Sequence, residues 1–269
     1  MTEFTIPKRT TIFAFAAIAF LVIAAVASFL VFDQQTLRYL YKLNPHWNYC
    51  KAAVIFKYLG KAWLLVWLIL FGGILTGKNR TMVIILLALL AVAPTVLPLK
   101  HLTGRQRPRD YIERVIENEN QEKTFPPVKS WSFPSGDTAS VFAVAVALSP
   151  FVSTLWGILL LPACCLIGLL RVVDFAHYPS DTLAGAAAGL LAGWIILKIF
   201  SLLPLPSWVD SKHFSIAKIA AFILIPLSLL IKDFAQFAGV IGSYGAILLI
   251  VFVVFSIKKK SASPQNKQN

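Results

Sequence analysis

About eight long apolar runs constrain the fold of this chain more than any other feature of its sequence. They cover roughly residues 11–32, 53–75, 81–99, 137–152, 154–172, 181–203, 216–231 and 239–257. A helix needs about 20 apolar residues to cross the hydrocarbon core of a bilayer, and most of these runs approach that length. The pattern predicts an all-α polytopic membrane protein built as a helix bundle.

The composition supports this prediction and excludes several other classes. Only 14% of the 269 residues are charged and 58% are hydrophobic, whereas soluble domains carry about 25% charged residues. Soluble globular, intrinsically disordered and collagen-like chains are therefore excluded. The net charge of +13 raises the possibility of a nucleic-acid partner, but the apolar runs exclude a soluble nucleic-acid binder, and cytoplasmic loops of membrane proteins collect Lys and Arg.

The flanking charges predict an orientation. The cationic residues Lys8 and Arg9 precede the first run, and Lys258, Lys259 and Lys260 follow the last one. Because positive residues favour the cytoplasmic side, we expect both termini there, in a cytoplasmic (inner) membrane. Lys and Arg between the first two runs weigh against this orientation.

The chain divides into four parts by composition. We expect an N-terminal span with an interfacial segment at 1–50, a core at 51–203, a helical pair at 204–257, which could instead be one re-entrant hairpin, and a disordered basic tail at 258–269. Within the core, residues 100–136 form a long polar loop, and such loops in compact proteins are usually functional. Gly185, Gly189 and Gly193 recur every fourth residue and predict a helix-packing face.

Three short polar segments stand at the ends of predicted spans. They are 100–108, which reads KHLTGRQRP, 133–138, which reads FPSGDT, and 170–181, which reads LRVVDFAHYPSD. Counting the spans places all three on the same face of the membrane. The three segments are therefore expected to form one site on the face opposite the termini, the outer face.

The residue types in these segments indicate a phosphate site. Lys100, Arg107 and Arg171 supply cations, and guanidinium groups match phosphate oxygens in a bidentate manner. Ser135 is a natural helix N-cap, and Gly136 allows close approach of the backbone. The amides and dipole of the helix that starts there favour a bound anion. The alternative is that these cations have no substrate to bind and only extend toward lipid headgroups.

His177 and Asp181 are a candidate catalytic pair. Asp181 follows His177 by four residues at the start of a predicted span. In this arrangement the carboxylate can fix one nitrogen of the imidazole ring, and the other nitrogen can attack phosphorus as a nucleophile. A purely structural hydrogen bond between the two residues is the alternative.

Together, the pattern Lys100-x6-Arg107-Pro108, Pro134-Ser135-Gly136 and Arg171-x5-His177-x3-Asp181 resembles the signature of the type 2 phosphatidic acid phosphatase (PAP2) superfamily, over about residues 50–200. The resemblance implies a six-helix core, to which two C-terminal transmembrane helices are added here. It also implies that His177 forms a phosphohistidine, that Asp181 supports it, and that Lys100, Arg107, Ser135, Gly136 and Arg171 bind phosphate. No metal or other cofactor is implied.

The sequence departs from the family pattern at two positions. Leu170 stands where the family usually has Ser, and Asp137 follows Pro-Ser-Gly where the family usually has His. That histidine protonates the leaving alkoxide in the family. Asp137 can do so only if bound phosphate keeps it protonated. Otherwise water or His101 serves, or catalysis is slow.

The sequence thus predicts a membrane phosphatase that hydrolyses a lipid phosphate monoester or diphosphate. Substrates typical of the resembling family are phosphatidic acid, phosphatidylglycerol phosphate, undecaprenyl diphosphate and other polyprenyl diphosphates, and lipid A phosphates. The alternative is a lipid-phosphate phosphotransferase or a catalytically impaired homologue that only binds lipid phosphate. A transporter is disfavoured because charges sit mainly at span ends. Lipid phosphate and membrane lipids are the expected partners, and the sequence does not indicate an oligomeric state.

Overall fold

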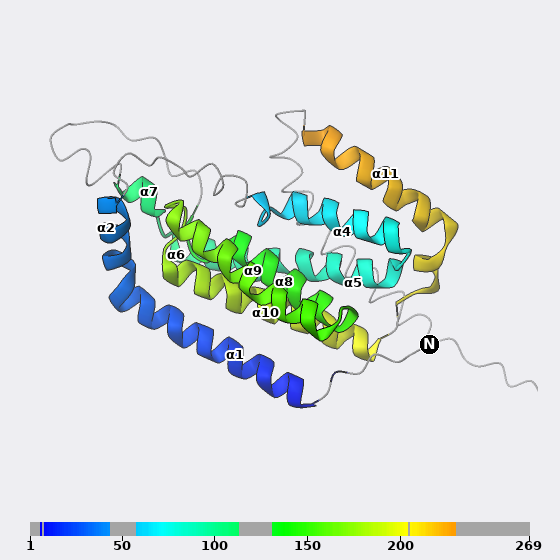
Figure 1. Ribbon diagram of the computed structural model, residues 1–269, viewed down its shortest axis with the longest axis horizontal. Coiled ribbons are helices and arrows are strands. Elements are labelled where there is room, and N and C mark those ends of the chain that lie inside the picture. The colour runs from blue at the N-terminus through cyan, green and yellow to red at the C-terminus, as the bar shows by residue number, and fades with distance from the viewer. Residues whose placement is uncertain (1–5, 7, 44–57, 113–130, 204, 230–269) are drawn as a thin grey trace, which may run out of the picture.

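The computed structural model describes residues 6, 8–43, 58–112, 131–203 and 205–229, and these residues form helices and their connections (Figure 1). No strand occurs in these ranges. The elements are α1 (Lys8–Ala27), the π-helical turn η1 (Ser28–Phe32), α2 (Asp33–Leu43), α4 (Ala62–Thr76), α5 (Asn79–Leu90), α6 (Val92–Thr103), α7 (Pro108–Tyr111), α8 (Gly136–Leu148), the 3-10 turn η3 (Ser149–Phe151), α9 (Thr154–Val173), α10 (Pro179–Leu202), the 3-10 turn η4 (Ser207–Asp210) and α11 (Lys212–Leu229).

The helices match the predicted spans in order, with some shifted boundaries. Four segments are long and apolar enough to cross a membrane: Thr10–Leu43, Asn79–Tyr111, Thr154–Val173 and Pro179–Leu202. Two shorter apolar helical segments are Ala62–Thr76 and Gly136–Phe151. Within the run expected at 53–75, a turn at Leu59 and Gly60 precedes α4, which begins at Ala62. The run at 239–257, the tail and most of the polar loop lie outside the described residues.

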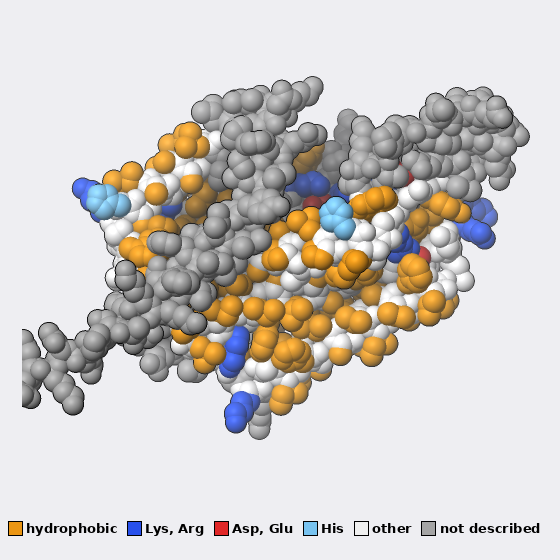
Figure 2. Space-filling model, turned by 180° about the vertical axis from the view of Figure 1, so that it is seen from behind, with side chains coloured by type: hydrophobic (Ala, Val, Ile, Leu, Met, Phe, Trp, Pro, Cys, Tyr) orange, Lys and Arg blue, Asp and Glu red, His pale blue; other side chains and the backbone are white. Residues whose placement is uncertain are grey.

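Hydrophobic side chains cover much of the described surface, as expected for a protein that faces lipid. In Figure 2 the visible described surface is mostly orange, and charged side chains are confined to a few places. Exposed apolar residues are concentrated on α1, η1 and α9, for example Phe13, Leu30, Leu155 and Ile158. A soluble monomer rarely exposes an apolar area this continuous. The chain is therefore an integral membrane protein of the all-α class.

Helix α10 packs closely against α8 through a glycine face. A Cβ atom on Gly185, Gly189 or Gly193 would overlap a backbone oxygen of α8 or of its N-cap Ser135. Small residues at every fourth position let two helix backbones approach in this way, which confirms the packing face expected from the sequence. The close approach places the N-terminal ends of α8 and α10 side by side, and Ser135 N–H donates to Asp181 O at 2.9 Å.

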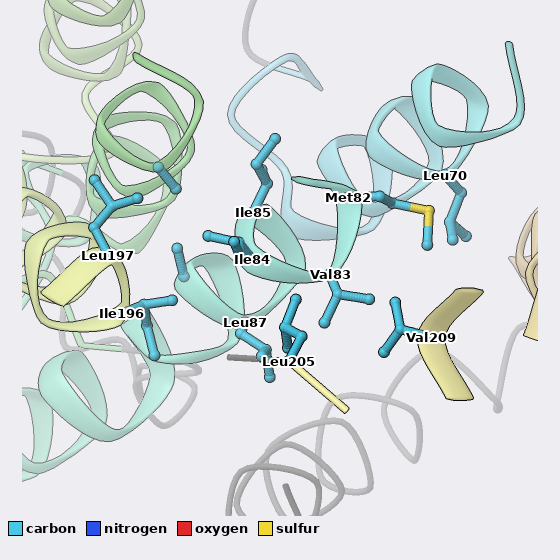
Figure 3. Close-up of a cluster of buried hydrophobic side chains, with 12 residues drawn as sticks. Leu70, Met82, Val83, Ile84, Ile85, Leu87, Ile196, Leu197, Leu205 and Val209 are labelled. Carbon is cyan, nitrogen blue, oxygen red and sulfur yellow. The ribbon is translucent and has the colours of Figure 1, made fainter. Parts of the chain in front are cut away.

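A hydrophobic core joins α4, α5 and α10 at the other end of the bundle. Figure 3 shows Leu70 of α4 beside Met82 of α5, while Ile196 and Leu197 approach α5 from α10 and Val209 approaches it from η4. Lys218 of α11 is buried here and donates to Asn79 Oδ1 and Gly73 O, at 2.5 and 3.1 Å. This lysine, which lies near the start of the run expected at 216–231, therefore ties α11 to α4 and α5.

Candidate active site

The three polar segments meet at one end of the bundle. The C-terminal ends of α6 and α9 and the N-terminal ends of α8 and α10 lie there, close to α2 and α7 at the left of Figure 1. Arg109 N–H donates to Phe175 O, and Ser132 N–H donates to Arg105 O. These backbone bonds join the first segment to the third and to the residues just before the second. The structure thus brings together the segments that the span count placed on one face.

His177 is buried in the turn between α9 and α10, beside Asp181. The distance from His177 Nδ1 to Asp181 Oδ2 is 3.6 Å, and the imidazole is 3% exposed. Ser132 lies between them. Its hydroxyl donates to Asp181 Oδ2 and lies 3.4 Å from His177 Nδ1. Because Nδ1 faces Ser132 and Asp181, Nε2 is the ring nitrogen left for attack on a substrate.

Burial lowers the pKa of His177 from its ordinary value of 6.5 to about 4; Asp181 opposes this effect, while Arg107 and Arg171 add to it. The imidazole is therefore neutral near pH 7, as a nucleophile must be.

The lowered pKa of His177 also predicts a dependence of stability on pH. Below pH 6.5 the imidazole binds a proton in the unfolded chain but not in the folded chain. The free energy of unfolding should therefore decrease as the pH falls from 6.5 to about 4. We expect thermal unfolding in detergent to show less pH dependence across this window in His177→Gln than in the wild type. Equal pH profiles would contradict this.

Three cationic side chains lie near His177 and Asp181 at this end of the bundle. Arg171 is 4% exposed and donates to Asp174 Oδ2 at 3.1 Å. Lys100 Nζ donates to Trp131 O at 2.8 Å, and Arg107 Nη1 donates a long hydrogen bond of 3.5 Å to Ala176 O. Arg107 Nε is buried without a hydrogen-bond partner among the described residues. Within these ranges, Lys100 and Arg107 thus contact carbonyl oxygens rather than carboxylates, which favours an anionic ligand.

Ser135 caps α8 as predicted. Its hydroxyl accepts from Thr138 N–H at 3.4 Å and from the Thr138 hydroxyl at 2.9 Å. The amides of Gly136 and Asp137 stand in the first turn, where a helix has no intrahelical carbonyl for them. The helix end therefore presents amides to a group held by the neighbouring cations.

Asp137 is held in two ion pairs. Its Oδ2 lies 3.0 Å from Lys61 Nζ and 3.2 Å from Arg171 Nε. Both partners are cations paired with its carboxylate group, and a carboxylate has no proton to give to a leaving group. The structure thus shows Asp137 as the centre of a salt-bridge network. His101, the other proton donor considered from the sequence, is exposed on α6.

A second network behind the site was missed at the sequence level. Arg105 spans two buried carboxylates, with Nη2 at 2.6 Å from Asp33 Oδ2 and Nη1 at 2.7 Å from Asp181 Oδ1. Ser180 N–H donates to Asp33 Oδ1 at 3.0 Å. Asp33 directly follows the π-helical turn η1, a distortion that is frequent at functional sites. An acidic residue at the end of an apolar run was the signal available for Asp33.

An apolar cavity of about 900 Å³ adjoins the site. It lies between α1, α6 and α10, and its lining includes Val22, Val26, Pro98 and Ala188. Arg105 and Phe133 line it as well, and they connect it to Asp181 and to the α8 N-terminus. This volume lies in the upper part of the range for ligand pockets, and the lining suits a hydrocarbon chain.

The described ranges contain no group of three or more His, Cys, Asp or Glu side chains arranged to hold a metal ion. Independence of metal ions stays a prediction.

Fold and site together define a class: a helical membrane protein with a cationic pocket and a buried histidine at one end of its bundle. The chain belongs to the PAP2 superfamily, whose family model matches residues 81–204. This range includes α6 to α10, all but the first two residues of α5, and every predicted site residue. Asp33 and Lys61 lie outside it.

Two solved structures are similar to the chain. The crystal structure of Aquifex aeolicus LpxE is 30% identical, with 60% of this chain and 94% of that chain covered and a TM-score of 0.46. The first transmembrane PAP2-type phosphatidylglycerolphosphate phosphatase from Bacillus subtilis is 21% identical, with 69% and 94% covered and a TM-score of 0.51. The second likeness concerns the fold. No curated protein matches the chain.

Proposed function

We propose that this protein is a membrane phosphatase that hydrolyses a lipid phosphate monoester or diphosphate through a phosphohistidine intermediate. The observation that carries the proposal is the neutral, buried imidazole of His177 within a group of cations at the polar end of an apolar cavity. The Bacillus subtilis structure is of a phosphatidylglycerolphosphate phosphatase, and this supports a lipid phosphate as substrate.

Each residue of the site has a proposed part in the reaction. Lys100, Arg107 and Arg171, with the Ser135–Gly136 helix end, hold the phosphate oxygens and stabilise their charge in the transition state. His177 Nε2 attacks phosphorus, while Asp181 and Ser132 hold the opposite side of the ring. Water then hydrolyses the phosphohistidine. The chain's own cations supply the electrostatic stabilisation in this scheme, without a metal ion.

The site is proposed to face the outside of an inner membrane. Lys78 and Arg80, near the start of α5, lie at the end of the bundle opposite the site, and Arg80 pairs with Asp210 of η4 there. By the positive-inside rule this end faces the cytoplasm. The cationic residues beside the site serve substrate binding in this interpretation.

A phosphate-release assay on a lipid panel tests the proposal. The purified protein is incubated with phosphatidic acid, phosphatidylglycerol phosphate, undecaprenyl diphosphate and lipid A phosphate. Release from at least one substrate is expected. No release from any of them by folded protein would overturn the proposal and favour the alternative of a lipid-phosphate-binding homologue. Transfer of phosphate to a lipid alcohol instead of water would favour the phosphotransferase.

Blocking the apolar cavity should affect long lipids selectively. We expect Ala188→Phe to raise KM for a long-chain lipid phosphate by about 10-fold, equal to roughly 1.4 kcal/mol of lost binding. A water-soluble short-chain phosphate should be affected little, because it does not fill the cavity. Leu169→Phe on the exposed face of α9 is the matched control. Equal effects of Ala188→Phe on both substrates would argue against the cavity as the tail site.

A further inference from the structure

The position of Lys61 beside the phosphate site was not expected from the sequence. Lys61 directly precedes α4, and its N–H donates to Tyr58 O at 2.9 Å to close a turn. The turn packs directly on α8: a Cβ atom on Gly60 would lie 3.0 Å from Asp137 Cβ. This contact fixes the ammonium group of Lys61 at the first turn of α8.

The charges around Asp137 determine what Lys61 can do there. A carboxylate next to a phosphate site repels the substrate unless cations neutralise it, and Lys61 Nζ and Arg171 Nε both contact the same oxygen, Asp137 Oδ2. Lys61 carries three N–H groups, of which Asp137 takes one. Its side chain is 35% exposed. The ammonium is therefore held at the site but is accessible to a ligand.

Among the described residues that form ion pairs with Asp137, Lys61 is the one that can transfer a proton. Arginine does not deprotonate in proteins, so Arg171 can only stabilise charge. Asp137 itself is paired as a carboxylate. Lysine is an established acid-base residue in proteins when its surroundings are suitable.

We propose that Lys61, oriented by Asp137, protonates the oxygen that leaves when His177 attacks phosphorus. This inference rests on the proposed function and names a further catalytic residue for it. In the first step the His177 Nε2–P bond forms, the P–O bond to the lipid breaks, and that oxygen takes a proton from the Lys61 ammonium. In the second step the Lys61 amine takes a proton from water as its oxygen bonds to phosphorus. The N–P bond breaks, and the neutral imidazole and the ammonium are regenerated.

The dependence of the rate on the leaving group tests this role. An alkoxide needs a proton to leave, whereas p-nitrophenolate leaves readily without one near neutral pH. We expect Lys61→Met to lower kcat on dioctanoyl phosphatidic acid by about 10²–10⁴-fold, the usual contribution of a general acid. On p-nitrophenyl phosphate the loss should be below about 10-fold, since the remaining contribution is electrostatic.

Three further variants sharpen the result. Lys61→Arg keeps the charge beside Asp137 but cannot give up its proton, so it should show the same selective loss even if Lys61→Met folds poorly. Lys100→Met, which removes a proposed phosphate ligand, should affect both esters alike. Lys78→Met, at the other end of the bundle, is the control with unchanged rates.

The outcomes separate this inference from the proposed function. Equal losses on both esters in Lys61→Met, or full activity of Lys61→Arg on phosphatidic acid, would overturn the proton-donor role of Lys61 alone. Failure of the unmodified protein to hydrolyse either ester or any lipid of the panel would overturn the proposed function itself.

Discussion

Replacing His177 by Ala is expected to lower phosphate release by about 10⁶-fold, the scale on which removal of a covalent nucleophile acts. The described site offers no second imidazole beside the cations, since His101 is exposed on α6. Lipid binding should persist, because the cations and the apolar cavity remain. The measurement is single-turnover phosphate release, together with trapping of the acid-labile phosphoenzyme from the unmodified protein and from His177→Ala.

The control for this experiment is His101→Ala, which should retain activity. Thermal unfolding in detergent shows whether each variant is folded. Unchanged release in folded His177→Ala would refute the assignment of His177 as nucleophile. A covalent phosphoenzyme that persists in the variant would point to a different nucleophile.

Replacing Arg105 by Met is expected to destabilise the fold by about 3–5 kcal/mol, because it leaves two buried carboxylates without their shared cation. Asp33 and Asp181 are 1% and 0% exposed, and Arg105 also lies 3.8 Å above the centre of the Tyr178 ring. Its loss should separate α2 from the N-terminal end of α10. The measurement is equilibrium unfolding in mixed detergent micelles.

The matched control is Arg80→Met. Arg80 also donates two hydrogen bonds to an aspartate, Asp210, but both side chains are substantially exposed, at 35% and 52%. Exposed ion pairs contribute about 0–1 kcal/mol. A comparable loss of stability in the two variants would contradict the view that burial makes the Arg105 network important. The double variant Arg105→Met/Asp33→Asn should recover part of the loss, since it removes one uncompensated charge.

The role of Asp137 shows how tertiary contacts change the interpretation of a motif. From the sequence, an aspartate in place of the usual histidine leaves three possibilities for the leaving-group proton: a protonated Asp137 supplies it, water or His101 supplies it, or catalysis is slow. The structure places Asp137 between Lys61 and Arg171. Release retained in Asp137→Asn would exclude Asp137 as proton donor, and the Lys61 variants then decide whether the adjacent ammonium takes that part.

The sequence alone determined the class of fold, the order of the helices and the convergence of the three motifs. Hydropathy is a property of contiguous residues, so a run of apolar residues predicts a span without knowledge of its neighbours. Once spans are counted, the membrane itself requires that Lys100, Ser135, Arg171 and Asp181 lie at one end of the bundle. The glycine spacing of 185, 189 and 193 predicted a packing face for the same local reason.

Only the tertiary structure decided which charges meet. The charged residues Lys61 and Asp137 are 76 residues apart, and the hydrogen bond from Ser180 to the carboxylate of Asp33 joins residues that are 147 apart. Their contacts depend on how α4 packs on α8 and how α2 packs on α10, and no local pattern records that packing. The apolar cavity likewise requires α1, α6 and α10 to lie together. Spans follow from local free energies of transfer into lipid, whereas the partner of a buried charge follows from the arrangement of the whole bundle.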